Sequence, residues 1–278
     1  MKLFPISICI LSWNSGKTLL NTLASYRKNG LLDLSDDITI LFQEVSKNDL
    51  EIAKKFGLKT IALQENIGIG KGISKLIENA KYENILFLEH DWELIENQKT
   101  LTERLRSGLE LLENGFEIVR YRSRKNPGYP VHSLRHKGNE LNYYDDWHKV
   151  TSPHLLESLY WLDPAESFQD KIQKNGEYFI TTSRWANWTN NPFLLKKEFY
   201  FKNIYDIAMK SEHFERDIAE WWVKQDFKIA QGEGLFMHND LKKHQKKTVF
   251  LNLKQNLQGF KILEGLKNLK GLKNWFKK

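Results

Sequence analysis

The 278-residue sequence is poor in cysteine and has no long apolar run. Its one cysteine, Cys9, lies inside a short apolar stretch, so disulfides play no part and a small core residue is expected. No apolar run approaches the roughly 20 residues of a membrane-spanning helix, and the one near the N-terminus is too short for a signal peptide. These features favour a protein of the reducing cytoplasm.

Acidic residues are almost missing from the C-terminal end. Residues 241–278 carry 11 lysines and one acid, Glu264, whereas the first 240 residues have a net charge of −3. This segregation favours a basic appendage on an ordinary globular domain over a chain built to bind nucleic acid. Apolar residues recur every three to four positions along this tail, which is typical of an amphipathic helix on an anionic membrane surface. A helix packed on its own domain or against a second copy in a homodimer is the alternative.

A phosphate-binding P-loop is also missing. Residues 16–18 (Gly-Lys-Thr) resemble the end of that motif, but Leu11 stands where the motif needs a glycine. A nucleotidyltransferase would normally show a glycine-rich loop with a basic residue directly after the first strand. Residues 12–16 (Ser-Trp-Asn-Ser-Gly) stand there instead, which disfavours that class.

Hydrophobic patterning predicts alternating strands and helices. Short apolar runs predict strands at residues 5–14, 38–42, 59–63, 85–88, 116–121, 177–182, 193–195 and 227–230. Helical spacing predicts helices after residue 15, at 48–56, 73–80 and 98–113, and near residues 198 and 218. The order of the first four strands, with short links, predicts a parallel, doubly wound sheet. Three alternating glycines at 68–72 indicate a tight turn or a close approach of the backbone before the third helix.

Residues 122–176 show weak periodicity and are rich in Arg, His, Tyr, Asn and Pro. A stretch this long inside a compact domain is typical of a functional loop or an insertion. Basic side chains such as Arg122 and Arg124 suit contacts to phosphate and sugar, and a variable surface insertion is the alternative.

Acidic residues directly follow the strand at 85–88. Glu89 and Asp91 flank His90, and charges at this density belong at the C-terminal end of a strand, where open α/β sheets place their ligands. Oxygen ligands at this spacing suit Mn²⁺ or Mg²⁺, with substrate phosphate completing the coordination. A solvated turn is the alternative. His238, which follows a later apolar triplet, is a candidate third ligand.

A second acidic cluster opens the helix near residue 218. Glu215 and Asp217 lie where the helix dipole favours anions, which is a sufficient structural reason for them, but a carboxylate facing a pocket there also suits a general base. Trp185 and Trp188 lie in a polar loop and are expected to expose flat faces for sugar rings. Their alternative role is to cover the core from outside.

In their order along the chain, these features resemble the family 2 glycosyltransferases of the GT-A fold. Residues 6–14 resemble the family's opening "SIVIPTYN", residues 65–68 its "N-x-G" segment, and residues 85–94 the strand that delivers its D-x-D metal motif. Residues 217–229 are similar to its "DLxxRLxxxGYxI" helix and strand. The sequence departs from the family at Glu44, within a Gln-Glu pair that replaces two aspartates, and at Glu89, which replaces the first aspartate of D-x-D.

The resemblance implies a domain organisation and a reaction. A single Rossmann-like α/β domain of GT-A fold with a mostly parallel sheet would span residues 1–245, with a nucleotide-sugar-binding half (1–95) and an acceptor-binding half (96–245) that includes the irregular insertion 122–176. The basic tail would span 246–278. The reaction would be a metal-dependent, inverting transfer from a nucleotide-diphosphate sugar, UDP-sugar foremost, to a hydroxyl of a glycan or lipid-linked acceptor. The protein would be cytoplasmic and peripheral on the membrane.

The resemblance also implies roles for individual residues. Metal ligands would be Asp91, Glu89 and His238, and Glu215 would be the catalytic base with Asp217 in reserve. The nucleotide-sugar site would comprise Leu11, Ser12, Trp13, Asn14, Glu44, Asn66, Gly68, Lys71 and His90. The acceptor site would comprise Trp185, Trp188 and Asn190. Because Glu44 and Glu89 depart from the family, a catalytically altered carbohydrate-binding or membrane-associated protein is the alternative.

Overall fold

The structure, a computed structural model, describes residues 3–128, 135–136, 139–140 and 164–239. The strands are β1 (Ile6–Trp13), β2 (Ile38–Gln43), β3 (Lys59–Ala62), β4 (Asn84–Glu89), β5 (Trp92–Leu94), β6 (Ile118–Arg122), β7 (Arg135–His136), β8 (Asn139–Glu140), β9 (Gln173–Asn175), β10 (Tyr178–Thr182), β11 (Phe193–Lys196) and β12 (Lys228–His238). The helices are α1 (Gly16–Lys28), the 3-10 turn η1 (Leu31–Asp33), α2 (Lys47–Phe56), α3 (Ile69–Glu78), α4 (Gln98–Glu113), α6 (Pro164–Ser167), α7 (Lys197–Asn203), α8 (Tyr205–Lys210) and α9 (Phe214–Trp222).

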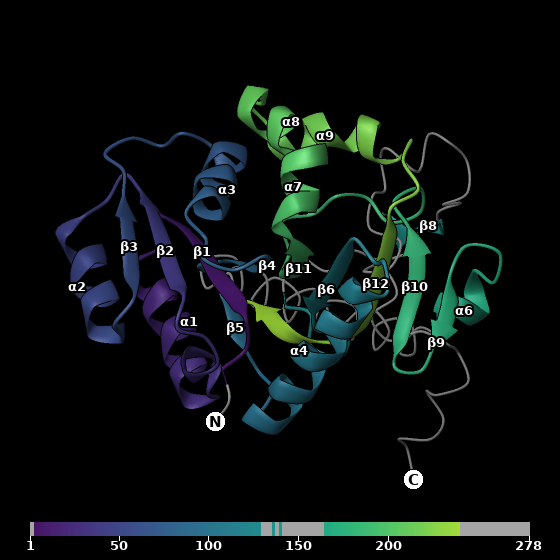
Figure 1. Ribbon diagram of the computed structural model, residues 1–278, viewed down its shortest axis with the longest axis horizontal. Helices are drawn as coiled ribbons and strands as arrows, with labels where there is room; N and C mark the ends of the chain where they lie inside the picture. The colour runs from purple at the N-terminus through teal and green to yellow at the C-terminus, as the bar shows by residue number, and fades with distance from the viewer. Residues whose placement is uncertain (1–2, 129–134, 137–138, 141–163, 240–278) are drawn as a thin grey trace, which may run out of the picture. The chain divides into compact units, whose positions relative to one another are not determined.

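One large mixed sheet organises these elements in the order β3-β2-β1-β4-β11-β6-β12-β10-β9, and β5 pairs with β12 (Figure 1). The first four strands pair in parallel, as the sequence predicts. The chain builds outward from β1 to β3 and then returns to place β4 on the other side of β1. In open α/β sheets, ligands bind at the carboxyl ends of the two strands where the order reverses, which here are β1 and β4.

Strand β11 lies between β4 and β6 and is antiparallel to both. Strand β12 restores the first direction because it pairs in parallel with β6. The α/β class with a mostly parallel central sheet is therefore confirmed. The direction of β11 could not be read from its apolar pattern, because a strand buried on both faces shows the same run of apolar residues in either direction.

Helices cover both faces of the sheet. Apolar residues of α1, α2 and α4 pack on one face, among them Leu19, Tyr26, Phe56 and Leu101. Apolar residues of α3, α7, α8 and α9 pack on the other face, among them Ile73, Tyr200, Phe214 and Trp222. Figure 1 shows α7, α8 and α9 grouped together beside α3. The helix predicted at 98–113 is confirmed with the same bounds.

The prediction that the third helix begins at residue 73 is wrong, because α3 begins at Ile69 and includes two of the three glycines. A Cβ atom on Gly70 would lie 2.6 Å from the backbone oxygen of Ala208, and one on Gly72 would lie 2.8 Å from a methyl carbon of Leu11. These glycines therefore let α3 pack closely against α8 and β1. Only Gly68, with φ of +84°, has the left-handed backbone of a turn.

Strand β12 is also longer than predicted. It continues beyond residue 230 through an irregular stretch of its pairing with β6, and it ends at His238. Gly234 in this stretch has φ of +80°, and a Cβ atom there would lie 2.1 Å from the backbone oxygen of Arg122. The glycine therefore permits the irregularity that carries His238 to its pairing with Trp92 of β5.

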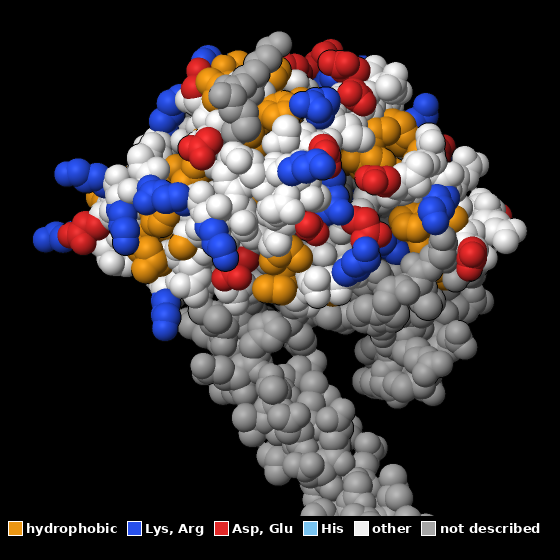
Figure 2. All heavy atoms as spheres, turned by 90° about the horizontal axis from the view of Figure 1, so that it is seen from below, with side chains coloured by type: hydrophobic (Ala, Val, Ile, Leu, Met, Phe, Trp, Pro, Cys, Tyr) orange, Lys and Arg blue, Asp and Glu red, His pale blue; other side chains and the backbone are white. Residues whose placement is uncertain are grey.

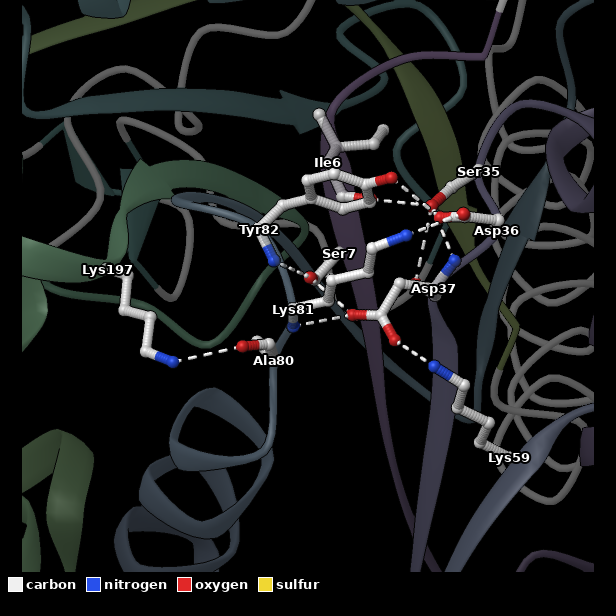
Figure 3. A network of polar contacts seen from close by, with 10 residues as sticks. All are labelled: Ile6, Ser7, Ser35, Asp36, Asp37, Lys59, Ala80, Lys81, Tyr82 and Lys197. Atoms are coloured by element: carbon white, nitrogen blue, oxygen red, sulfur yellow. Dashed lines mark hydrogen bonds and ion pairs between the residues drawn. The ribbon is translucent and has the colours of Figure 1, made fainter.

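A network around Asp37 ties the beginnings of the parallel strands together (Figure 3). The carboxylate accepts hydrogen bonds from Ser7 Oγ at 2.5 Å, from Lys59 Nζ at 2.6 Å and from the backbone N–H of Lys81 at 2.8 Å. Burial by itself would raise the pKa of Asp37, but these donors outweigh it and hold the pKa below its usual value. The network lies at the opposite end of β1 from the acidic turn at 89–91.

Of the described residues, no helix is both long and apolar enough to cross a membrane. Figure 2 shows a face on which basic and acidic side chains are interspersed. The predicted tail at 246–278, the boundary at residue 245 and most of the insertion 122–176 lie outside the residues that the structure describes.

Candidate active site

The carboxyl ends of β1 and β4 are joined by a backbone hydrogen bond from His90 to the oxygen of Leu11, at 2.9 Å. Leu11 and Ser12 are buried, so their side chains belong to the floor of this region, whereas Trp13 is 48% exposed. Burial lowers the pKa of His90. The turn of residues 89–91 is thereby fixed against the end of β1, at the reversal of the strand order.

The structure brings Asp91 and His238 together from opposite parts of the chain. His238 Nε2 lies 3.0 Å from Asp91 Oδ2, and the ring of Trp92 packs edge-on to that of His238 at 4.8 Å. The backbone N–H of Asn239 donates to the backbone oxygen of Asp91 at 2.6 Å. Burial alone would raise the pKa of Asp91, but His238 outweighs it and keeps the carboxyl acidic.

Asp91 Oδ1 is buried and has no hydrogen-bond partner among the described residues. A buried carboxylate oxygen without a donor is costly, and a cation would satisfy it. Asp91 and His238 thus fit two positions of a Mn²⁺ or Mg²⁺ ion, which keeps its other positions for water or substrate phosphate. In the described part of the chain, no group of three or more His, Cys, Asp or Glu side chains is arranged to hold a metal by itself.

Glu89 lies beside this pair, and its pKa is shifted in the opposite direction from that of Asp91. Burial raises the pKa of Glu89 well above its usual value, and the negative charges of Asp91 and Glu215 raise it further. Its ionised form therefore needs a compensating cation. Two of the three predicted metal ligands, Asp91 and His238, thus contact each other. The third, Glu89, lies beside them and would be ionised more readily with a cation bound.

The end of β2 contributes Glu44, whose Oε2 accepts a hydrogen bond from Trp13 Nε1 at 2.6 Å. Among the residues that the structure describes, Glu44 and Asn14 are the two non-glycine residues with positive φ, at +51° and +46°. Such backbone costs roughly 1–3 kcal/mol per residue and clusters at functional sites. The two strained residues follow adjacent strands, and both lie in the region where the sequence predicts nucleotide binding.

The segment before α3 is fixed by two amide side chains. Gln43 Oε1 accepts the backbone N–H of Ile67 at 2.8 Å, and Asn66 Oδ1 accepts that of Gly68 at 2.9 Å. Gln43 replaces an acidic residue of the family's pattern. Because it is buried, its side chain holds this segment in place and is not exposed to a ligand. Lys71 is exposed on the first turn of α3. Asn66, Gly68 and Lys71 thus lie on one segment that is held against the end of β2.

Glu215 opens α9, and its Oε1 accepts the backbone N–H of Asn190 at 2.8 Å. Its side chain is exposed and lines a pocket of about 420 Å³ together with Ile69 and residues 212–216. A volume of this size is within the range of small-molecule sites. Because the charge of Glu215 raises the pKa of Glu89, the two carboxyl groups share one electrostatic environment.

Asp217 is occupied by its own turn. Its Oδ2 accepts from Ser211 Oγ at 2.7 Å and from the backbone N–H of His213 at 3.2 Å, and Arg216 binds its Oδ1. These hydrogen bonds lower the pKa of Asp217. The carboxylate thus stabilises the start of α9, and of the two predicted catalytic acids Glu215 has the side chain that lines the pocket.

The prediction that Trp188 exposes a flat face is wrong, because only 2% of the residue is accessible. Its ring packs edge-on against Phe193, Phe214 and Trp222 at 5.3–5.5 Å. The polar neighbours of Trp188 in the sequence suggested an exposed loop. One of them, Asn190, is itself buried and accepts the indole N–H through Oδ1 at 3.0 Å. A polar loop can therefore bury a tryptophan when it supplies the hydrogen-bond acceptor itself.

Trp185 is half-buried and packs at the edge of the same core. The Nζ atom of Lys171 lies 4.8 Å from the centre of its ring, a cation–π contact that occupies part of the indole surface. Of the two tryptophans predicted to contact the acceptor, Trp185 is thus the more accessible.

Three alternating arginines, two on β6 and one directly after it, are all buried: Arg120, Arg122 and Arg124. Arg122 donates from Nε to the backbone oxygen of Pro127 at 3.0 Å, and its guanidinium carbon lies 5.3 Å from the centre of the Trp92 ring. The positive charge of Arg122 thus lies against the Trp92 ring, which also contacts the ring of His238. The alternation of arginine with other residues is visible in the sequence. Arg120, however, lies within the strand predicted at 116–121 and was not predicted as a site residue.

Comparison with known sequences identifies the class. Residues 7–154 match the family described as Glycosyl transferase family 2. The match covers more than half of the chain, so the chain belongs to this family. No curated protein sequence gives a significant match.

Solved structures share the fold at low sequence identity. S. aureus TarS 1–349 is 15% identical with a TM-score of 0.51, and the match covers 86% of this chain and 60% of that one. The same protein in complex with UDP gives 14% identity and a TM-score of 0.50, with the same coverage. Glucosyl-3-phosphoglycerate synthase from Mycobacterium tuberculosis, in complex with Mn²⁺, UDP and phosphoglyceric acid, is 13% identical with a TM-score of 0.46 and is covered over 70% of its length, against 84% of this chain. This chain therefore spans less than two thirds of the TarS chain, and the TarS likeness supports the GT-A fold.

Proposed function

We propose that this glycosyltransferase transfers a sugar from a nucleoside-diphosphate donor to an acceptor hydroxyl, with inversion at the anomeric carbon and with help from a divalent cation. The observation that carries this proposal is the buried Oδ1 of Asp91, which has no hydrogen-bond partner within the described part of the chain. It lies beside His238, at the point where the strand order reverses. Open α/β sheets bind their ligands at the carboxyl ends of the two strands where the order reverses. A cation bound there would offset the cost of burying this carboxylate oxygen.

The donor nucleotide would lie over the carboxyl ends of β1 and β2. The exposed indole of Trp13, together with Asn14 and Glu44, would contact the base and ribose. The fixed segment of Asn66, Gly68 and Lys71 would face the phosphates and the sugar, while Leu11, Ser12 and His90 would shape the floor. A uridine base is the first choice, since a structure of TarS, which shares the fold, holds UDP.

Asp91 and His238 would hold Mn²⁺ or Mg²⁺, with Glu89 as a further ligand once its carboxyl group is ionised. A bound divalent ion would neutralise charge that develops on the departing diphosphate. Asp91 serves this role because its carboxyl group stays ionised, and Arg122 adds positive charge from behind the Trp92 ring.

Glu215 would act as the general base. The acceptor oxygen forms its bond to the anomeric carbon as the bond from that carbon to the diphosphate oxygen breaks, and the acceptor proton passes to the Glu215 carboxylate. The acceptor would enter the pocket that Ile69 and residues 212–216 line, with Trp185 as an outer contact. A glycan or a lipid-linked saccharide fits such a pocket, whose lining is both acidic and apolar.

Three further proposals come from the sequence. The tail at 246–278 would bind an anionic membrane surface. The protein would then work at the cytoplasmic face of that membrane. A homodimer that forms through the tail is the alternative to membrane binding. Vesicle binding by the full chain and by a chain ending at residue 249 separates the membrane role from the others.

A carbohydrate-binding protein without catalysis is the second candidate, because Glu44 and Glu89 stand where the family's pattern has aspartates. The separating experiment first screens nucleotide sugars by thermal shift with and without Mn²⁺, since stabilisation grows with ligand concentration over Kd. The best donor is then incubated with acceptor, and nucleoside diphosphate release is measured. Glycosyl transfer predicts metal-stimulated release that is lost in Asp91→Asn. Binding without release would overturn the enzymatic proposal.

A further inference from the structure

The carboxylate of Glu215 is held from outside its own helix. Its Oε1 accepts the backbone N–H of Asn190, which belongs to the loop between β10 and β11. A carboxylate that accepts a backbone N–H has one oxygen fixed in direction, and hydrogen bonds to ionised acceptors are stronger than those between neutral groups. The orientation of Glu215 therefore depends on where this loop lies.

Two tryptophan N–H groups fix that loop in turn. Trp222, on the same helix as Glu215, donates from Nε1 to the backbone oxygen of Ala186 at 2.9 Å. Trp188 donates from Nε1 to Asn190 Oδ1 at 3.0 Å. Both indole groups are buried, and their rings pack on each other at 5.3 Å.

The ring of Trp188 also packs on Phe214, the residue before Glu215, at 5.5 Å. One side chain therefore contacts both the ring of the residue before Glu215 and the residue whose N–H binds the Glu215 carboxylate.

We propose that Trp188 and Asn190 are positioning residues for Glu215: the Trp188 indole holds Asn190, whose backbone N–H aims the Glu215 carboxylate at the pocket. This inference rests on the proposed role of Glu215 as general base. It assigns to Trp188 a role in catalysis that works through the core, in place of a contact with sugar. A base misplaced by about 1 Å can cost roughly 10²-fold in rate, so a single hydrogen bond behind it has a measurable effect.

The test is a set of single substitutions in the full chain, assayed for nucleoside diphosphate release and for thermal stability. Trp188→Phe keeps an aromatic ring in the core and removes the indole donor, and Asn190→Ala removes the acceptor of the same bond. Each should lower kcat by about tenfold or more while the KM for the donor stays within about twofold, because the donor site is untouched.

Tyr200→Phe is the matched control. It also removes one buried hydrogen bond from a ring that stays in the same core, the 2.9 Å contact between the Tyr200 and Ser74 hydroxyl groups. It should lower the melting temperature by a similar amount and leave kcat within about twofold. Equal losses of kcat in all three variants would mean that Trp188 matters only for stability, and would overturn the proposal.

The double variant Trp188→Phe with Asn190→Ala gives a second, independent readout. Because both substitutions break one bond, their effects on kcat should not multiply, and the double variant should resemble the worse single one. Multiplied losses would contradict a shared mechanism. If Glu215→Ala itself keeps near-normal turnover, the base assignment fails. Unchanged kcat in Trp188→Phe, with turnover lost in Glu215→Ala, refutes the positioning role alone.

Discussion

The imidazole Nε2 of His238 lies 3.0 Å from Oδ2 of Asp91, although the two residues come from opposite parts of the chain. Asp91 follows β4, and His238 is the last residue of β12, which reaches it only through the irregular stretch around Gly234. The contact uses one oxygen of Asp91 and leaves the other buried without a donor among the described residues. The proposed cation site rests on this buried oxygen.

Substitution of either member of this pair should reduce metal-dependent turnover. We expect Asp91→Asn to lower kcat by roughly 10²–10³-fold, the range for loss of one preorganised electrostatic contact to developing charge. His238→Ala should weaken Mn²⁺ binding by about 10-fold or more, measured by calorimetry with the nucleoside diphosphate present. Asp206→Asn, on the exposed side of α8, is the control. Full turnover of Asp91→Asn in the presence of a chelator would remove the metal role.

Glu215→Gln should lower kcat by roughly 10²–10⁴-fold, because the amide cannot accept the acceptor proton. The variant keeps an oxygen for the N–H of Asn190, so the loop and the melting temperature should change little. Glu220→Gln, which lies on the same helix and pairs with Lys224 at the surface, is the matched control. A larger loss of turnover in Asp217→Asn than in Glu215→Gln would move the base to Asp217.

The two glycines inside α3 should respond differently to alanine. A Cβ on Gly70 meets the backbone of Ala208, which cannot move aside, whereas a Cβ on Gly72 meets the end of the Leu11 side chain. Gly70→Ala should therefore lower the free energy of unfolding by about 1–3 kcal/mol, the range for overpacking, and Gly72→Ala should cost less. Urea denaturation of both variants measures the difference. Equal or reversed effects would show that α8 yields to α3 easily.

The stabilising contribution of Asp37 should depend on pH. Its folded pKa lies below the unfolded value of about 3.9, so the ionised form is favoured by folding. The contribution is fully present above that unfolded pKa and is lost as the pH falls through the folded pKa. We expect Asp37→Asn to be less stable than the unchanged chain at pH 7 and this difference to shrink below about pH 4.

Denaturation midpoints measured at several pH values test this expectation. Asp36→Asn, at the neighbouring exposed carboxylate, is the control and should show a smaller effect at pH 7 because its partner Lys81 is also exposed. A stability difference for Asp37→Asn that stays constant down to pH 3 would show that the Asp37 carboxylate is not the titrating group.

Local patterns were sufficient for most of the framework. Continuous apolar runs located β1, β2 and β4, which are buried on both faces. Helical spacing located α4, which buries one side, because its period of burial appears directly in the sequence. The acids after β4 could be assigned to the strand end because charges at this density do not fit a buried strand interior. The start of α3 was misplaced, because glycine indicates a turn and close helix packing equally well until the neighbouring helix is known.

Long-range contacts decided the rest. The sequence by itself determined the family, the parallel order of the first strands and a set of polar residues at their ends. Only the tertiary structure decided that Asp91 pairs with His238, that Asp217 is occupied by its own turn, and that Trp188 lies in the core. These outcomes depend on distances between residues far apart in the chain, and such distances follow from the path of the whole backbone, which a local pattern does not encode.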